Sequence, residues 1–264
     1  MKQRVFVTGA TGGMGFASLK EMLKDTDKQD IVILARDSEK NRNILKPYTE
    51  TPGLEIVWGD LNNYDDVLKC VKGCDLILHI AAFVSPAADY YPKQAMKVNY
   101  GSTRNIISAI YELGQQERTR LVYIGTVAET GDRMPPVHWG RVGDPIKPSM
   151  FDYYAVSKVA AERLVIESGL KYWVSLRQTG IIGRAMAEIE DAIMFHNCFD
   201  NVLEYCSDRD SARAMKNLCA FFHDGSLEES FWGHIYNIGG GAPCRISTYA
   251  VSYTHLTLPT KLEV

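Results

Sequence analysis

Three glycines at a regular spacing, Gly9, Gly12 and Gly15, come directly after a short run of β-branched and aromatic residues near the start of this chain. The run over residues 4–8 predicts a strand, and the helical pattern that follows extends to Leu23. Glycine lets backbone N–H groups approach phosphate oxygens, and the N-terminus of a helix favours negative charge. Three glycines alone also occur in plain turns, but the strand–turn–helix context predicts a diphosphate site. Its expected contacts are Gly9, Thr11, Gly12, Gly13, Met14 and Gly15.

Strand-like and helix-like segments alternate along the chain after this turn. Strands are expected over residues 31–34, 54–58, 76–80, 121–124, 173–176 and 235–238, and the two clearest helices over 93–113 and 151–168. This rhythm predicts an α/β protein with a doubly wound, mostly parallel sheet. Two irregular segments, 130–150 and 180–210, each follow a strand. We therefore expect them at the carboxyl edge of the sheet, where ligands bind in such folds.

The composition is that of an ordinary globular chain, and it argues against several kinds of partner. Of the 264 residues, 46% are apolar and 23% are charged, with a formal net charge of −3. No basic run suggests nucleic acid binding, and no apolar stretch is long enough to span a membrane. The six cysteines form no CxxC pair and no histidine lies at zinc-finger spacing. We therefore expect no metal site, and reduced thiols as in a cytoplasmic enzyme.

The end of the second expected strand bears on which dinucleotide would bind. In folds of this type an acid about 20 residues beyond the glycine turn usually binds the adenosine ribose. The acid's expected place holds Ala35, and Arg36 follows it. Because a guanidinium suits a 2′-phosphate, the sequence favours NADP over NAD. Two alternatives stay open: Arg36 is only a surface charge, or Asp37 binds the ribose after a shift in register by two.

A tyrosine and a lysine four residues apart, Tyr154 and Lys158, lie in the helix expected over residues 151–168. That spacing puts both side chains on one helix face. An ammonium close to a phenol favours the phenolate, so we expect Lys158 to lower the pKa of Tyr154. A tyrosine that titrates nearer neutrality can act as a general acid or base on a carbonyl or hydroxyl. The YxxxK pattern is common by chance, but behind a glycine-rich first turn it predicts catalysis.

Together with further segments, these motifs resemble the extended branch of the short-chain dehydrogenase/reductase superfamily, the group called NAD-dependent epimerase/dehydratase. The resemblance covers residues 3–250. The further segments are Gly59-Asp60-Leu61, His79-Ile80-Ala81-Ala82, Val98-Asn99-Tyr100-Gly101-Ser102-Thr103, Gly125-Thr126, Arg177-Gln178-Thr179-Gly180 and Tyr236-Asn237-Ile238-Gly239-Gly240-Gly241. An ordered set of this kind is far more specific than any one motif, and it implies a Rossmann-like domain with a small, truncated C-terminal substrate lobe.

The resemblance implies four residues at the reacting centre. Tyr154 is expected to be the general acid/base, and Lys158 to hold the nicotinamide ribose. Thr126 takes the place of the hydroxyl that binds the substrate oxygen, and Asn99 supports the site from the long helix. The residue pattern also allows Asn99 to be only a buried polar link.

The resemblance also implies cofactor contacts at the ends of the third and fourth strands. Asp60 and Leu61 are expected to border the adenine, and Ala81 and Ala82 to line the cofactor near its ribose. Asp60 has the alternative of being a helix cap. His79 is interpreted as a strand-end histidine and not as a catalyst.

The substrate side of the expected site is less well defined. Ser85 follows the fourth strand, and Arg133, His138 and Arg141 lie in the segment over residues 130–150. They are candidates to bind a sugar-nucleotide diphosphate or a carboxylate, with solvated surface charges as the alternative. Val127-Ala128 stand where the 4,6-dehydratase members of the family carry an Asp-Glu pair. The resemblance therefore disfavours 4,6-dehydration.

Three classes of function follow from this set of residues. The first is an epimerase of a polar small molecule such as a nucleotide sugar, with a bound nicotinamide dinucleotide. The second is an NADPH-dependent carbonyl reductase, and the third a non-catalytic dinucleotide sensor, which the Tyr154–Lys158 pair disfavours. The resemblance also implies a homodimer formed by the helices over residues 93–113 and 151–168.

The C-terminal end of the sequence differs in character from the rest. Residues 251–260 resemble the translation of a sequencing adapter, so residues 251–264 are expected to be a non-native tail. The expected organisation is a dinucleotide-binding domain over residues 1–250, with substrate-loop insertions at 130–150 and 180–210.

Overall fold

The computed structural model describes residues 2–131, 140–183, 198–241, 243–245, 247 and 248. The expected tail over residues 251–264 lies outside the described residues, so its foreign origin stays a prediction. Within the described part, no helix is both long and apolar enough to cross a membrane.

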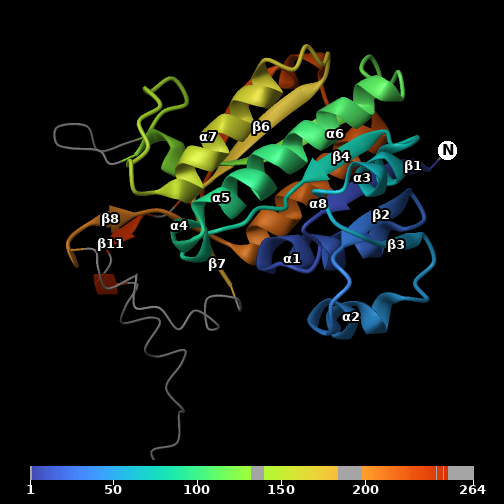
Figure 1. Ribbon diagram of the computed structural model, residues 1–264, viewed down its shortest axis with the longest axis horizontal. Coiled ribbons are helices and arrows are strands. Elements are labelled where there is room, and N and C mark those ends of the chain that lie inside the picture. The colour runs from blue at the N-terminus through green and yellow to red at the C-terminus, as the bar shows by residue number, and fades with distance from the viewer. Residues whose placement is uncertain (1, 132–139, 184–197, 242, 246, 249–264) are drawn as a thin grey trace, which may run out of the picture.

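Seven parallel strands form one sheet in the order β3-β2-β1-β4-β5-β6-β10 (Figure 1). Their bounds are β1 Gln3–Thr8, β2 Gln29–Ala35, β3 Leu54–Trp58, β4 Leu76–His79, β5 Arg120–Thr126, β6 Trp173–Gln178 and β10 His234–Ile238. The central strands are almost entirely buried, because both faces of the sheet are covered. The doubly wound, Rossmann-like fold class is confirmed.

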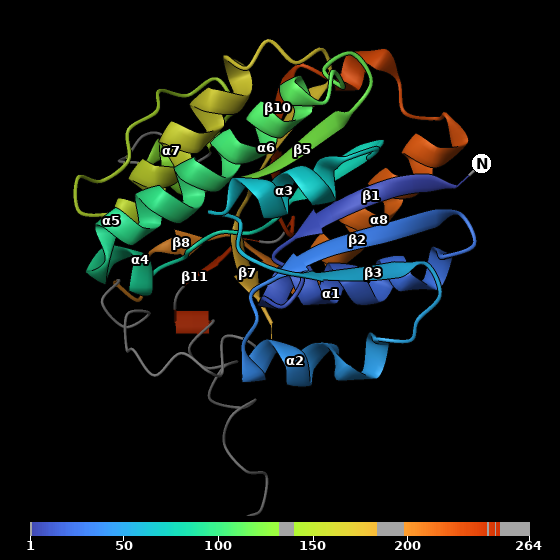
Figure 2. The ribbon, with the colours of Figure 1, turned by 45° about the vertical axis from the view of Figure 1, so that its right-hand side comes forward.

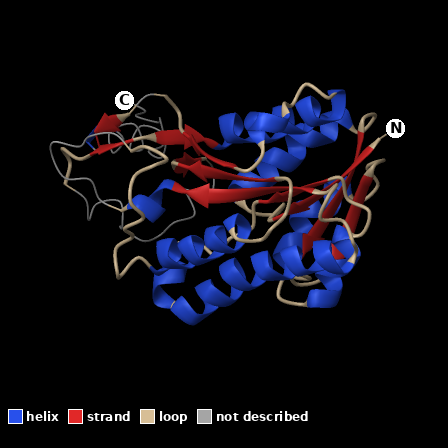
Figure 3. Cartoon of the chain, turned by 90° about the horizontal axis from the view of Figure 1, so that it is seen from above, coloured by secondary structure: helices blue, strands red, loops and turns tan. Residues whose placement is uncertain are grey.

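Helices cover both faces of this sheet (Figure 3). On one face, α1 (Gly13–Met22), α2 (Glu39–Leu45) and α8 (Asp208–Asp224) bury their apolar side chains, including Leu19 and Met215, in one core cluster. On the other face, α3 (Tyr64–Val71), α6 (Gly101–Glu112) and α7 (Tyr153–Ile166) enclose a second core around Phe6 and Tyr123. These two cores fix the helices that carry the site.

Shorter elements complete the described chain. The helical turns are Leu23–Asp25, Lys46–Tyr48, α4 (Ala87–Tyr90), α5 (Pro92–Ala95), a π-helical turn over Met96–Tyr100, Val127–Thr130 and Glu229–Phe231. The short strands are β7 (Gly180–Ile182), β8 (Val202–Leu203), β9 (Tyr205–Ser207) and β11 (Cys244–Arg245). They pair as β7 with β9 and β11 with β8.

All expected strands are present, with ends that differ by one or two residues. The helix expected over residues 93–113 is present as α5, the π-helical turn and α6 in succession. The segment 180–210, expected to be irregular, contains β7, β8 and β9, and α8 begins within it. Helices α2, α3 and α8 were not among the predicted elements.

The order of the strands indicates where in the sheet a ligand site is expected. The chain winds outward from β1 to β2 and β3, and then from β4 to β5, β6 and β10 on the other side. In open α/β sheets a ligand crevice forms where the winding reverses, beyond the carboxyl ends of the strands. Here the reversal lies between β1 and β4, and because β1, β4 and β5 are parallel neighbours, their carboxyl ends lie at one edge of the sheet. The arrows of β1 and β2 point toward this edge in Figure 2.

Candidate active site

The glycine turn joins β1 to α1 with very little room for side chains. Gly9 has a φ of +70°, and a Cβ there would lie 2.8 Å from the Cα of Ala81. A Cβ on Gly15 would overlap the carbonyl oxygen of Gly9. The turn is closed by the Gly12 amide, which donates to the Gly9 carbonyl at 2.9 Å. Only glycine fits these two positions, because backbone approaches backbone there.

The N-terminus of α1 is open to a ligand. Gly12, the residue before the helix, and Gly13, its first residue, are both exposed. The first amides of a helix have no acceptor within the helix, and the helix dipole favours an anion beside them. The expected contacts Thr11 and Met14 are partly exposed in the same turn. The geometry therefore fits a diphosphate, as the glycine spacing predicts.

A buried hydrogen-bond chain holds the end of β4 against this turn. The Ala81 amide donates to the Thr8 hydroxyl at 2.9 Å, and that hydroxyl lies 2.9 Å from Nδ1 of His79. Nε2 of His79 lies 3.0 Å from the Thr103 hydroxyl on α6. Burial lowers the pKa of His79 to about 3, so the ring is neutral. His79 is thus a structural link, in keeping with its interpretation as a strand-end histidine.

The residues expected around the adenosine lie at the ends of β2 and β3. Arg36 is exposed directly after β2, whereas Asp37 forms two hydrogen bonds to Arg42, at 2.6 and 2.8 Å. Asp60 accepts from the Asn62 amide at 2.7 Å, which defines a local turn. The α3 cap is Asn63, so Asp60 is not a helix cap.

Tyr154 lies in the first turn of α7, opposite the end of β5. The Asp152 carboxylate caps the helix by accepting from the Ala155 amide at 2.7 Å. The Tyr154 phenol interacts with the Thr126 side chain, and this interaction lowers the pKa of Tyr154 against a larger rise caused by burial. Thr126, the last residue of β5, is 7% exposed. The two hydroxyls that the resemblance assigned to catalysis are thus together at the carboxyl edge of the sheet.

Lys158 is placed differently from the sequence-based expectation. Its Nζ donates to the Ile124 carbonyl at 2.7 Å and lies 4.1 Å from the centre of the Tyr123 ring. Burial lowers the pKa of Lys158 to about 8. The pKa of Tyr154 is raised by burial and, to a smaller extent, by the charges of Glu129 and Asp152. The expectation that Lys158 lowers the Tyr154 pKa is therefore wrong for this structure, because the Lys158 ammonium is bound by the Ile124 carbonyl and the Tyr123 ring of β5.

Asn99 occupies the π-helical turn before α6 and ties three segments together. Its Oδ1 accepts from the Phe83 amide at 2.7 Å, and its Nδ2 donates to the Phe83 carbonyl at 3.0 Å. The same Nδ2 donates to the Ser157 hydroxyl at 2.8 Å. A π-helical turn of this kind is frequent at functional sites. Asn99 is thus a buried polar link that also fixes the loop after β4 against α7.

A buried ion-pair cluster directly behind Tyr154 was missed from the sequence. Glu162, two turns after Tyr154 on α7, binds Arg177 of β6 through contacts of 3.0 and 2.5 Å. The Ser175 hydroxyl donates to Glu162 at 2.5 Å, and Glu129 lies 3.7 Å from Arg177. Gly125 leaves room for the cluster, since a Cβ there would lie 2.8 Å from the Ser175 hydroxyl. The sequence signal that could have indicated this cluster is the position of Glu162, four residues after Lys158 and therefore on the same helix face.

The substrate-side candidates are not brought together by the described residues. Ser85 is partly exposed after β4, and Arg141 is exposed in a loop where its amide donates to Asp144 at 2.8 Å. Arg133 and His138 lie outside the described residues. These four assignments stay predictions.

A model of the NAD dependent epimerase/dehydratase family matches residues 5–205. Among curated relatives, 3β-hydroxysteroid dehydrogenase/Δ5→4-isomerase of vaccinia virus is 30% identical over 195 residues, covering 67% of this chain and 52% of the relative. A 3β-hydroxysteroid dehydrogenase of Mycolicibacterium neoaurum is 30% identical over 209 residues, covering 76% of this chain and 52% of the relative. The chain thus spans about half the length of these curated relatives.

Solved structures with the same fold include dTDP-glucose 4,6-dehydratase from Bacillus anthracis, in complex with NAD. Its TM-score is 0.77 at 18% identity, and the match covers 98% of this chain and 82% of that one. UDP-glucose 4-epimerase from Thermus thermophilus, also in complex with NAD, gives a TM-score of 0.74 at 22% identity, covering 96% and 83%. At these identities the likeness shows the fold.

Proposed function

The chain belongs to the NAD dependent epimerase/dehydratase family, and we propose that it is a nicotinamide-dependent oxidoreductase that interconverts a carbonyl and a hydroxyl group. One observation carries the proposal. The side chains of Tyr154 and Thr126 interact at the carboxyl edge of β5, and the glycine turn ends β1 at the same edge. In an open parallel sheet, a ligand bound beyond the carboxyl ends of the strands can reach both of these places.

The titration state of Tyr154 favours one direction of this chemistry. Because its pKa is raised, the phenol is protonated near neutral pH and can donate a proton to a substrate oxygen. Thr126, at the end of β5, interacts with that phenol and is proposed to bind the same substrate oxygen. A nicotinamide dinucleotide, when bound, supplies the hydride. Tyr154 is therefore proposed as the general acid of a carbonyl reduction.

The glycine turn is proposed to hold the diphosphate of that dinucleotide. Gly13 and Met14 offer amides at a helix N-terminus, and Gly9, Gly12 and Gly15 leave the backbone accessible. Asp60, Leu61, Ala81 and Ala82 are proposed to line the adenosine half, since they follow β3 and β4 at the same edge. Lys158 and Asn99 are proposed to support the nicotinamide end.

We favour NADP over NAD because the one acid near the end of β2 is already engaged. Asp37 is bound to Arg42, and Arg42 also lies 4.8 Å from the centre of the Trp58 ring. Arg36 is exposed beside this pair, and its backbone carbonyl accepts from Asn41 at 2.8 Å. Its guanidinium is therefore available for a 2′-phosphate.

Replacing Arg36 with alanine is expected to weaken NADPH binding about 10- to 100-fold, because one charge-assisted hydrogen-bond pair is lost. The dissociation constant of NADH should change less than about threefold. Titration calorimetry with both dinucleotides measures the difference. Arg213→Ala, an exposed arginine on α8, is the matched control. An equal loss for NADH and NADPH would show that Arg36 does not bind the 2′-phosphate.

The choice between net reduction and epimerisation depends on the fate of the cofactor. The two 30% identical relatives are named as hydroxysteroid dehydrogenases, which favours net oxidation or reduction. A shorter match, 32% identical over 109 residues, is a UDP-glucose 4-epimerase of Rickettsia akari, which supports epimerisation as the second candidate. Stoichiometric oxidation of added NADPH by a panel of ketosteroids and other carbonyl compounds would support reduction. Tightly bound dinucleotide with no net turnover would support the epimerase instead.

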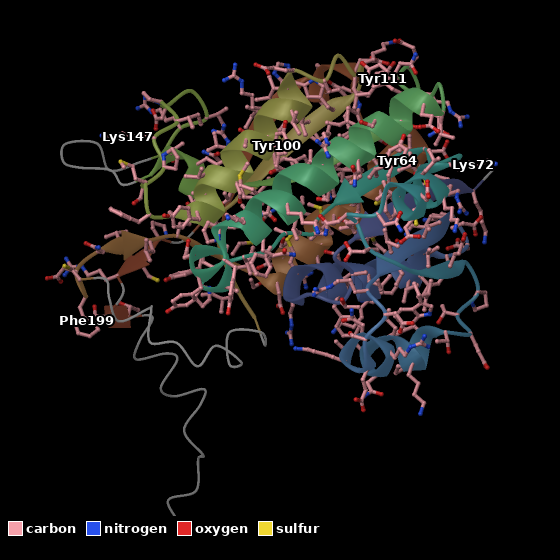
Figure 4. All side chains as sticks on the ribbon, viewed as in Figure 1. Tyr64, Lys72, Tyr100, Tyr111, Lys147 and Phe199 are labelled. Atoms are coloured by element: carbon pink, nitrogen blue, oxygen red, sulfur yellow. The ribbon has the colours of Figure 1, made fainter. Side chains whose placement is uncertain are left out.

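We also propose that the protein pairs with a second copy through α6 and α7. The two helices lie side by side on the surface of the sheet, with Tyr100 and Tyr111 near the two ends of α6 (Figure 4). Apolar side chains stay exposed along this surface, including Met96, Tyr111, Val156 and Ile166. Sedimentation velocity of the purified chain tests whether it is a dimer.

A further inference from the structure

Glu129 is a buried acid to which the proposed function assigns no role. It lies in the helical turn Val127–Thr130, directly after β5, and its side chain is fully buried. Its Oε1 accepts from the Thr126 amide at 3.3 Å, and the Thr126 hydroxyl accepts from the Ala128 amide at 3.2 Å. This reciprocal cap fixes the backbone of the residue that binds the Tyr154 hydroxyl.

The groups that face Glu129 come from three elements. Strand β5 contributes the phenol of Tyr123, and β6 contributes Arg177. Helix α7 contributes three more ionisable side chains, Tyr154, Lys158 and Glu162. Burial raises the pKa of Glu129 to about 9, and Glu162 adds to the rise, while Arg177 and Lys158 act in the opposite direction.

The second carboxyl oxygen of Glu129 has no hydrogen-bond donor among the described residues. The Arg177 Nε is 3.7 Å away, which is too long for a hydrogen bond, and its Nε and Nη2 are already bound to Glu162, whereas its Nη1 has no acceptor among the described residues. The Glu129 and Glu162 carboxyls lie against the same Arg177 Nε, at 3.7 and 3.0 Å, so that each shifts the pKa of the other. A carboxylate oxygen buried without a donor is costly, whereas an O–H on that oxygen could donate to Glu162.

We propose that Glu129 is an uncharged positioning residue, a carboxylic acid that donates a hydrogen bond to Glu162 and holds Thr126 in place beneath Tyr154. The role given to Thr126 rests on the proposed function. A proton kept on Glu129 then leaves the Glu162 carboxylate to balance Arg177. An ionised Glu129 would disfavour a negative charge on Tyr154.

The test asks whether the stability of the folded chain depends on the proton of Glu129. A carboxyl that keeps its proton in the folded chain but loses it in the unfolded chain makes stability fall as pH rises between the two pKa values. For Glu129 this window runs from the ordinary value of 4.5 to about 9. Glu129→Gln keeps an oxygen for the Thr126 amide and an N–H for Glu162, and it does not titrate.

Urea midpoints of the wild type and Glu129→Gln should be measured from about pH 5 to about pH 8.5. We expect the urea midpoint of Glu129→Gln to rise steadily relative to that of the wild type as pH rises. The matched control is Glu39→Gln, an exposed glutamate in the first turn of α2, which should show no such trend. The proposal is overturned if the difference in urea midpoint between the two proteins is the same at every pH, or if the wild type becomes the more stable one as pH rises. Because no step of this test measures turnover, its failure is separable from failure of the proposed activity.

A second measurement checks the positioning role. Hydrogen exchange of the peptide that contains Thr126 should be as slow in Glu129→Gln as in the wild type, and faster in Glu129→Leu, which has no acceptor for the amide. Fast exchange in both variants would show that the amide oxygen cannot replace the acid, and would contradict the proposal.

Discussion

Replacement of Tyr154 by phenylalanine is expected to lower kcat about 100- to 10,000-fold, the range over which positioned general acids act. The variant removes one oxygen and keeps the ring, so the packing of the first turn of α7 should be retained. The dissociation constant of the dinucleotide should change little, because the diphosphate site lies at the other end of the crevice. Stopped-flow measurement of NADPH oxidation, combined with calorimetric titration, separates the two quantities.

The neighbouring Tyr153 provides the control. It lies one position earlier on α7 and is 38% exposed, and its backbone amide donates to Asp89 at 3.0 Å. Tyr153→Phe removes the same atom from the same helical turn without touching Thr126. Near-wild-type turnover in Tyr154→Phe, or an equal loss in both variants, would remove Tyr154 from the proposed chemistry.

Replacement of Gly15 by alanine should abolish dinucleotide binding and destabilise the fold. The new methyl group would overlap the carbonyl oxygen of Gly9, and neither atom can move without displacing β1 or α1. Overpacking in a core typically costs about 1–3 kcal/mol, and a backbone-to-backbone clash belongs at or above the upper end. The same displacement pulls the first amides of α1 away from the diphosphate position.

Gly143 is the matched control for that substitution. It lies in an exposed loop, and nothing lies within 4 Å of the position that a Cβ would occupy. Urea unfolding and calorimetric titration with NADPH should show both effects in Gly15→Ala and neither in Gly143→Ala. If Gly15→Ala binds NADPH as the wild type does, the glycine turn is not the diphosphate site.

The fold could be predicted from the sequence because its strands are mostly apolar and are separated by clear turns. The strand around Ile31–Leu34 is an unbroken apolar run, and Glu55 is the one charged residue in the strand over Leu54–Trp58. Helix α2 was harder to predict, since Leu45 is its one fully buried residue and its first five positions are polar. Helix α3 carried a usable signal, because Asn63 precedes two acids in its first turn, as expected for a helix start.

The site was predictable only where chemistry depends on local spacing. Gly9, Gly15, Tyr154 and Thr126 occupy the turn and the strand end that their motifs indicated. The environment of Lys158 was not predictable in this way, because the Ile124 carbonyl and the Tyr123 ring reach it from another element. The same holds for the Glu129–Glu162–Arg177 cluster, which exists only once β5, β6 and α7 pack together.

A crystal structure of the chain with NADP bound tests the central claim most directly, namely that one crevice joins the glycine turn to Tyr154. We expect the diphosphate on the amides of Gly13 and Met14, the 2′-phosphate against Arg36, and the nicotinamide ring beside the Tyr154 hydroxyl. A dinucleotide bound elsewhere, or a nicotinamide ring turned away from Tyr154 and Thr126, would contradict the proposed function.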